Sequence, residues 1–70
     1  MGIRKLKNSI GRKIRNLRLD REISQEKLAE YVNISREHIS CIERGKHLPT
    51  IETLFSFAKY FSIDIKEFFD

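Results

Sequence analysis

The chain has 70 residues, a single cysteine and a formal net charge of +4 at pH 7. A chain of this length builds one domain with one small core, and one cysteine excludes an internal disulfide. No apolar run approaches the ~20 residues that cross a bilayer, and the basic N-terminus lacks the apolar segment of an export signal. We therefore expect a single cytoplasmic domain over residues 9–70, preceded by a flexible basic arm over residues 1–8.

The charge is distributed unevenly along the chain. Residues 1–22 carry a net charge of +6, whereas residues 23–70 carry −2. A basic segment beside an acidic remainder creates an oriented field that favours one face of the molecule meeting phosphate. From composition alone, a phosphate-binding face and a solvated basic helix that only aids solubility are about equally well supported.

Residues 9–21 are predicted to form the first helix. Ile10, Ile14 and Leu17 recur at i, i+4 and i+7 and so share one side of it, and Ser9 is a suitable N-cap. Basic residues occupy its other faces.

Two short helices are predicted next, over residues 24–32 and 35–44. Ser24 and Ser35 are their N-caps, and Asn33 between them tolerates the left-handed backbone that ends a helix. The apolar positions of the two helices have helical spacing and form one inward surface: Leu28, Ala29, Val32, Ile39 and Ile42.

A fourth helix is predicted over residues 51–61, because Pro49 ends the preceding loop and Thr50 is an N-cap. Its apolar stripe completes the core and comprises Leu54, Phe57, Ala58 and Phe61. A short fifth helix is expected over residues 64–69, with Asp64 as its cap.

An ordered pattern, SQ-x2-LA-x4-IS-x3-IS-x-IERG-x3-P, runs from Ser24 to Pro49. With it, the sequence resembles the lambda-repressor-like helix-turn-helix family, which includes Cro, phage repressors and xenobiotic-response-element regulators, from about Ile10 to Phe68. The resemblance implies a compact, all-α, five-helix DNA-binding domain whose third helix enters the major groove. It also implies that Arg18 pairs with Glu43 and so ties the first helix to the third.

Two positions depart from the family pattern. Many members carry Gly or Asn where this chain has Glu22, and Gly where it has Ser62. A positive φ at Glu22 would strain the backbone mildly, so the corner before the second helix is the part of the fold that the pattern specifies least.

On a helical wheel, residues 35–44 divide into an inward face around Ile39 and Ile42 and an opposite face that a DNA groove would meet. The base-reading candidates are Arg36, Glu37, Ser40 and Cys41. The last three belong to that opposite face, whereas Arg36 lies nearer the inward face but in the first turn, where its long side chain can swing outward. Arg36 is the strongest, because a guanidinium binds both acceptors on a guanine edge, and Glu37 can accept a hydrogen bond from a cytosine amino group.

Phosphate contacts are expected at helix N-termini, at the far end of the third helix and in the loop after Gly45. The candidates are Ser24, Gln25, Ser35, Arg44, Lys46 and His47. The role of Gln25 follows from the family resemblance.

Competing chemistries are weakly supported. His38, Cys41 and His47 are too few for a structural zinc site, so we expect no metal and no cofactor. Cys41 as a redox switch on the reading face is an open hypothesis. The sequence has no catalytic constellation, which argues against an enzyme.

The sequence thus predicts a sequence-specific DNA-binding transcriptional regulator. A homodimer through the last two helices, with Phe55, Tyr60 and Phe69 at the contact, would read the two half-sites of a palindromic operator. The alternative is a protein-interaction module, such as an antitoxin or adaptor, that uses the same aromatic residues. Because the sequence ends after the fifth helix, we expect no ligand-sensing domain, as in small phage regulators and controller proteins of restriction–modification systems. The operator and the choice between activation and repression stay open.

Overall fold

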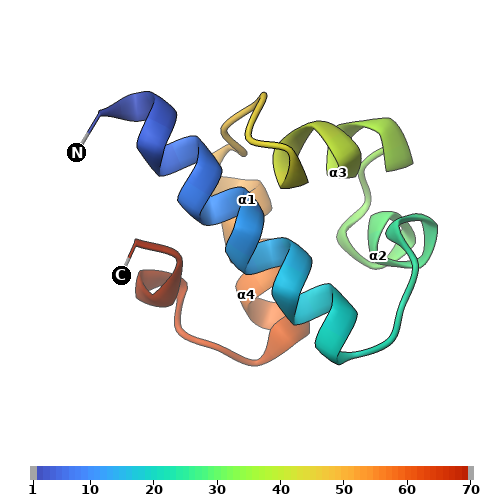
Figure 1. Ribbon diagram of the computed structural model, residues 1–70. Coiled ribbons are helices and arrows are strands. Elements are labelled where there is room, and N and C mark those ends of the chain that lie inside the picture. The colour runs from blue at the N-terminus through green and yellow to red at the C-terminus, as the bar shows by residue number, and fades with distance from the viewer. Residues whose placement is uncertain (1, 70) are drawn as a thin grey trace.

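Helices make up most of the computed structural model, which describes residues 2–69 (Figure 1). They are α1 (Ile3–Asp20), α2 (Gln25–Val32), α3 (Arg36–Glu43), α4 (Ile51–Phe61) and the 3-10 helix η1 (Ile65–Phe69). The all-α class is confirmed, but the fifth element is a 3-10 helix, so four α-helices replace the expected five. Met1 and Asp70, the outer ends of the predicted arm and domain, lie outside the described residues.

The helix α1 begins six residues earlier than predicted. Gly2 is its N-cap, with extended backbone at φ −77° and ψ 159°, and the helix ends at Asp20. The predicted arm is therefore wrong over the described residues, and so is Ser9 as the N-cap. Leu6 explains the longer helix, because it lies four residues before Ile10, continues the apolar stripe and packs against the core.

The turn between α2 and α3 is built from three polar residues. Ser24 Oγ accepts a hydrogen bond from the Lys27 N–H, and Ser35 Oγ accepts one from the His38 N–H, each at 3.0 Å. Asn33 ends α2 in the left-handed conformation, at φ 59°. These caps confirm both helix starts and the turn between them.

The helix α4 has the predicted bounds. Thr50 Oγ1 accepts a hydrogen bond from the Thr53 N–H at 3.1 Å and caps its first turn. Glu22 and Ser62, the two departures from the family pattern, have φ values of 54° and 56°. Both residues thus occupy the left-handed region that favours glycine.

Apolar residues from all four α-helices and η1 form one core. Its buried members are Ile10, Ile14, Leu28, Ala29, Val32, Ile39, Ile42, Leu54, Phe57, Ala58, Phe61 and Phe68. The predicted stripes are confirmed except at Leu17, which is only partly buried. The next residue, Arg18, is buried although it is charged, because it pairs with Glu43.

Within the core, α1 lies directly against the C-terminal end of α3. A Cβ atom added to Gly11 would lie 2.2 Å from the Ile42 carbonyl oxygen and 3.0 Å from that of Glu43. Only glycine permits this approach of one helix to the backbone of another. Among residues 2–69, no helix has the length and apolar character needed to span a membrane.

Candidate nucleic-acid interface

A buried polar network fixes α3 to α1 and α2. Arg18 Nε donates to Glu43 Oε2 at 2.7 Å, and Arg18 Nη2 donates to Glu43 Oε1 at 3.1 Å. Their side chains are only 11% and 2% exposed. Gln25 Nε2 also donates to Glu43 Oε1 at 3.1 Å, and Arg18 Nη1 donates to the Ile23 carbonyl at 2.9 Å.

This network sets the orientation of α3 through its last turn. The two hydrogen bonds between guanidinium and carboxylate define a planar, directional contact. A buried pair of this kind is strongly destabilised when one partner is removed, because the other charge stays buried. Two helices therefore hold α3 in one orientation by polar bonds, in addition to the apolar packing of Ile39 and Ile42.

The opposite face of α3 is open to solvent. Arg36, Glu37 and Arg44 are exposed, while Ser40 and Cys41 are partly buried beside them. The structure thus places the four predicted base-reading residues on the side of α3 away from the core. This face combines guanidinium, carboxylate, hydroxyl and thiol groups, the hydrogen-bonding groups that base edges require.

Arg44 lies back along α3. Its Nε donates to the Ser40 carbonyl at 3.3 Å, and its Nη2 lies 3.8 Å from Cys41 Sγ. The side chain therefore covers part of the face that Ser40 and Cys41 form. Sequence reasoning placed Arg44 near the far end of the helix and missed this contact, since the rotamer of an exposed arginine has no signal in the sequence.

His47 lies beside α3 and not in an isolated loop. Its ring is 6.1 Å from that of His38, centroid to centroid, in an edge-to-face arrangement. An open pocket of about 350 Å³ there is lined by Ser35, Glu37, His38, Cys41 and His47. His38 was missed as a residue of this surface, although it follows Glu37 in the first turns of the helix. Residues 2–69 contain no cluster of three or more metal-binding side chains.

Three of the other predicted phosphate contacts are already engaged within the domain. Ser24 and Ser35 accept capping hydrogen bonds, and the Gln25 amide nitrogen donates to Glu43. Lys46 is exposed in the loop after α3. Apart from the two N–H groups bonded to these caps, the first-turn N–H groups of α2 and α3 have no partner within their own helices, and such groups are typical anion-binding groups.

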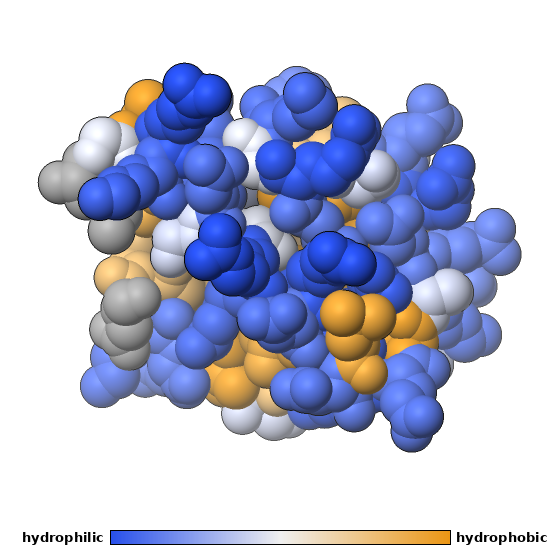
Figure 2. Space-filling view, in the orientation of Figure 1, coloured by the Kyte–Doolittle hydropathy of each residue, from blue (hydrophilic) through white to orange (hydrophobic). Residues whose placement is uncertain are grey.

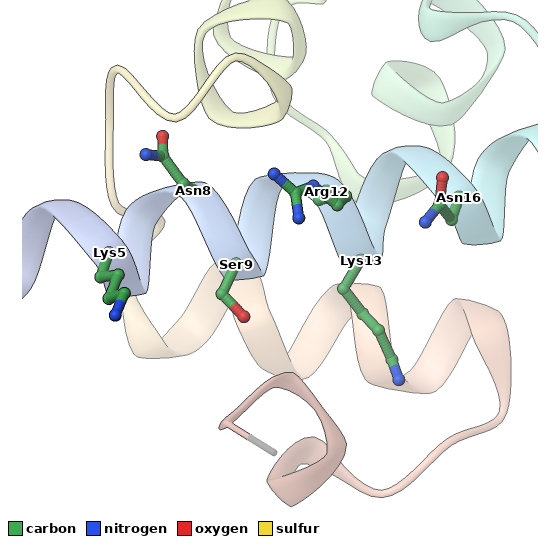
Figure 3. A pocket seen from close by; sticks show the side chains of 6 residues that line it. All are labelled: Lys5, Asn8, Ser9, Arg12, Lys13 and Asn16. Carbon is green, nitrogen blue, oxygen red and sulfur yellow. The ribbon is translucent and has the colours of Figure 1, made fainter. Parts of the chain in front are cut away.

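A second polar surface extends from the predicted first helix into residues 1–8, which were expected to be a flexible arm. It is an open hollow of about 730 Å³ along α1 (Figure 3). Its lining residues are Lys5, Asn8, Ser9, Arg12, Lys13 and Asn16. In the space-filling view the face over α1 is predominantly hydrophilic, with an apolar cluster near the C-terminal end of the helix (Figure 2).

The helices α2 and α3 are short and joined by a turn with a left-handed residue. One side of α3 is bonded to α1 and α2, and its other side is open to solvent. This arrangement defines a helix-turn-helix DNA-binding domain. Residues 14–68 match the Helix-turn-helix family. The chain belongs to the lambda-repressor-like branch of this family, whose members are non-enzymatic DNA-binding transcriptional regulators.

Curated relatives support this assignment. The chain is 42% identical over 55 residues to the HTH-type transcriptional activator BcrR of Enterococcus faecalis, a match covering 79% of the chain and 27% of BcrR. It is 35% identical over 57 residues to the uncharacterized HTH-type transcriptional regulator MJ0272 of Methanocaldococcus jannaschii, covering 81% of the chain and 86% of that protein. The chain thus spans about a quarter of the first relative and most of the second.

A solved structure agrees with the fold. The HTH_3 family transcriptional regulator from Vibrio cholerae superposes with a TM-score of 0.87 at 31% identity. The superposition covers 97% of this chain and 38% of that one. Nearly the entire chain, α1 included, therefore has a counterpart in that regulator.

Proposed function

We propose that this domain binds double-stranded DNA sequence-specifically and regulates transcription, with α3 in the major groove. The observation that carries the proposal is that α3 has one side packed against the domain and one side open to solvent. Its inner side is bound by Ile39, Ile42 and Glu43, whereas its outer side is free of other elements. A helix is about 10–12 Å wide and the major groove about 12 Å, so such a helix fits the groove with its outer side chains against the base edges.

In this proposal the base edges are read by the outer face of α3. Arg36 donates two hydrogen bonds to a guanine, and Glu37 accepts one from a cytosine amino group. Ser40 and Cys41 lie one turn further along, where small side chains permit close approach and a thymine methyl can contact the thiol. Arg44 moves from its position over Cys41 to a phosphate when DNA is bound.

The flanking phosphates are held by residues at both ends of the unit. Ser24 and Gln25 place the first turn of α2 against one strand, and Ser35 does the same for α3 through its N–H groups. Lys46 and His47 contact the backbone beyond the end of α3. These contacts fix the register of the domain on DNA without reading its sequence.

We further propose a homodimer on a palindromic operator. The domain measures 31 × 24 × 21 Å, a size compatible with two copies side by side whose α3 helices lie about one helical turn of DNA apart, which is roughly 34 Å. Phe55 and Phe69 are 57% and 48% exposed and provide apolar contact area at α4 and η1. Tyr60 is only partly exposed, and its ring is stacked 4.7 Å from that of Tyr31.

A second candidate function rests on the same exposed aromatic residues. If Phe55 and Phe69 bind a different protein, the domain acts as an antitoxin or adaptor and its α3 face is not selective for DNA. In the DNA-binding proposal, the domain acts in the cytoplasm, because its DNA target is there. Selection of binding sites from random duplexes separates the two functions, because only the DNA reader recovers a palindrome and binds with a steep salt dependence.

Two single substitutions then test the roles within the interface. We expect Arg36→Ala to weaken binding to the selected site by about 1–3 kcal/mol and to relax the preference at one base position. Lys46→Ala removes the same charge but should weaken all sequences about equally and reduce the salt slope by about one. An unchanged base preference in Arg36→Ala would remove Arg36 from base reading, and a sequence-selective loss in Lys46→Ala would contradict its phosphate role.

A further inference from the structure

The basic hollow along α1 has no role in the function proposed above. Its six lining residues recur three to four positions apart, so they form a continuous stripe on the outer side of the helix. From Lys5 to Asn16 this stripe is roughly 16 Å long at 1.5 Å per residue. Five of the six residues precede residue 14, where the match to the family begins.

The lining has the chemistry of an anion site. Lys5, Arg12 and Lys13 are cationic, the other three residues offer hydroxyl or amide donors, and none is acidic. Within residues 2–69, no ion pair engages these three cations. They are therefore available to a partner.

The placement of these charges is unfavourable for the helix itself. The N-terminal end of a helix is stabilised by acidic side chains and destabilised by basic ones. The first turn of α1 has no acidic residue, and Arg4, Lys5 and Lys7 stand in its first two turns. Helix stability thus gives no reason for this pattern, whereas binding of a polyanion does.

The hollow adjoins the DNA side of the domain. The Asn8 side chain contacts Gly45, since a Cβ atom added there would lie 2.0 Å from Asn8 Oδ1. Gly45 immediately follows α3 and precedes Lys46. In Figure 3, Asn8, Arg12 and Asn16 lie along one edge of α1, and Lys5, Ser9 and Lys13 along the other. The edge of the stripe that carries Asn8 and Arg12 thus borders the end of α3, whereas Lys5 and Lys13 lie on its far edge.

We propose that this stripe is a second DNA-binding site, which holds backbone phosphates of the duplex flanking the segment read by α3. Lys5, Arg12 and Lys13 supply the charge, and Asn8 and Asn16 donate hydrogen bonds to phosphate oxygens. The site carries no base readout, so it lengthens the footprint and raises affinity for any sequence. It rests on the proposed function, because the duplex must first lie against α3.

The test compares two double variants that each remove two positive charges. Lys5→Gln/Arg12→Gln alters the stripe, and Lys59→Gln/Lys66→Gln alters exposed lysines of α4 and η1. Binding is measured by fluorescence anisotropy, from low to high salt, on the selected site with long flanks and on the same site trimmed to its core. On the long duplex we expect the stripe variant to lose affinity about tenfold and its salt slope to fall by about two. The control variant should stay within about twofold, and both should match the parent on the trimmed duplex. Thermal unfolding verifies that both variants are folded, and size-exclusion chromatography verifies that the changes in α4 and η1 leave the oligomeric state of the parent unchanged.

Several outcomes would overturn the proposal. One is an equal loss of affinity for the long duplex in the two double variants, which would show that only the net charge of the protein matters. Another is a stripe variant that binds the long duplex as tightly as the parent. If that variant also loses the parent's binding to phosphatidylserine vesicles, the stripe binds a membrane surface and not DNA. Failure of the proposed function is recognised separately: the parent itself then selects no site, and Arg36→Ala has no effect on base preference.

Discussion

Replacing Gly11 with alanine should destabilise this protein, even though helix propensity predicts the opposite. Gly11 lies in the interior of α1, where alanine is favoured over glycine by about 1 kcal/mol. The added Cβ would lie 2.2 Å from the Ile42 carbonyl oxygen. Carbon–oxygen contacts in proteins are normally about 3.3 Å or longer, so α1 and α3 must separate by about 1 Å.

The magnitude follows from what this separation loosens. Overpacking in a close-packed interior costs about 1–3 kcal/mol, since the obstructing atoms are backbone and cannot rotate away. Moving α1 also stretches the 2.7 Å hydrogen bond between Arg18 and Glu43, which contributes about 1–2 kcal/mol more when weakened. After the propensity gain of about 1 kcal/mol is subtracted, a net loss of about 2 kcal/mol remains.

Urea unfolding followed by circular dichroism measures this loss, with Arg15→Ala as the control. Arg15 is exposed on the same helix, so its replacement should change the free energy of unfolding by less than about 0.5 kcal/mol. Specific DNA affinity of Gly11→Ala should fall as well, because α3 is tilted relative to the groove. A Gly11→Ala protein that is about 1 kcal/mol more stable than the parent would refute the reasoning, because propensity alone would then govern the site.

Three further predictions concern the clamp, the turns and the reading face. Arg18→Met should lower the free energy of unfolding, measured in urea, by about 3–5 kcal/mol, because Glu43 is left buried without its partner. The double variant Arg18→Met/Glu43→Leu should recover part of that loss, and a double variant no more stable than Arg18→Met would contradict this reasoning. Glu22→Gly and Ser62→Gly should each stabilise by about 0.5–1 kcal/mol and raise the Tm by several degrees, because both residues have positive φ; a lower Tm in either would contradict this. Alkylation of Cys41 with N-ethylmaleimide should abolish specific DNA binding in a mobility-shift assay while the fold persists, with Cys41→Ser as the resistant control; full binding by the alkylated protein would place Cys41 off the DNA face.

The elements that were predictable have strong local signals. Ser24, Ser35 and Thr50 are caps followed by apolar residues at helical spacing, and each accepts the expected backbone hydrogen bond. Asn33 ends α2 as a left-handed residue should. Local chemistry therefore determines α2, α3 and α4 to within about one residue.

The elements that were not predictable depend on distant contacts. The first turns of α1 lack a side-chain cap, and the apolar stripe there is reduced to Leu6, so the helix is stabilised by packing that the local pattern does not show. The pair between Arg18 and Glu43 spans 25 residues and was expected only from the family resemblance. The hollow on α1 was predictable only in part: Arg12 and Lys13 lie on the helix that was predicted, whereas Lys5 and Asn8 lie in the segment that was taken to be flexible.

The two ends of α3 are held differently, and this bears on how the domain would read DNA. Near its C-terminal end, Glu43 is bonded to Arg18 and Gln25, and the Ile42 carbonyl lies against Gly11. At its N-terminal end, the Ser35 cap and the short turn from α2 are the main constraints. Rigid anchoring at one end fixes the angle at which α3 enters a groove. The first turn, which carries Arg36, would then leave the side chain proposed to read a guanine room to adjust to the base edge it meets.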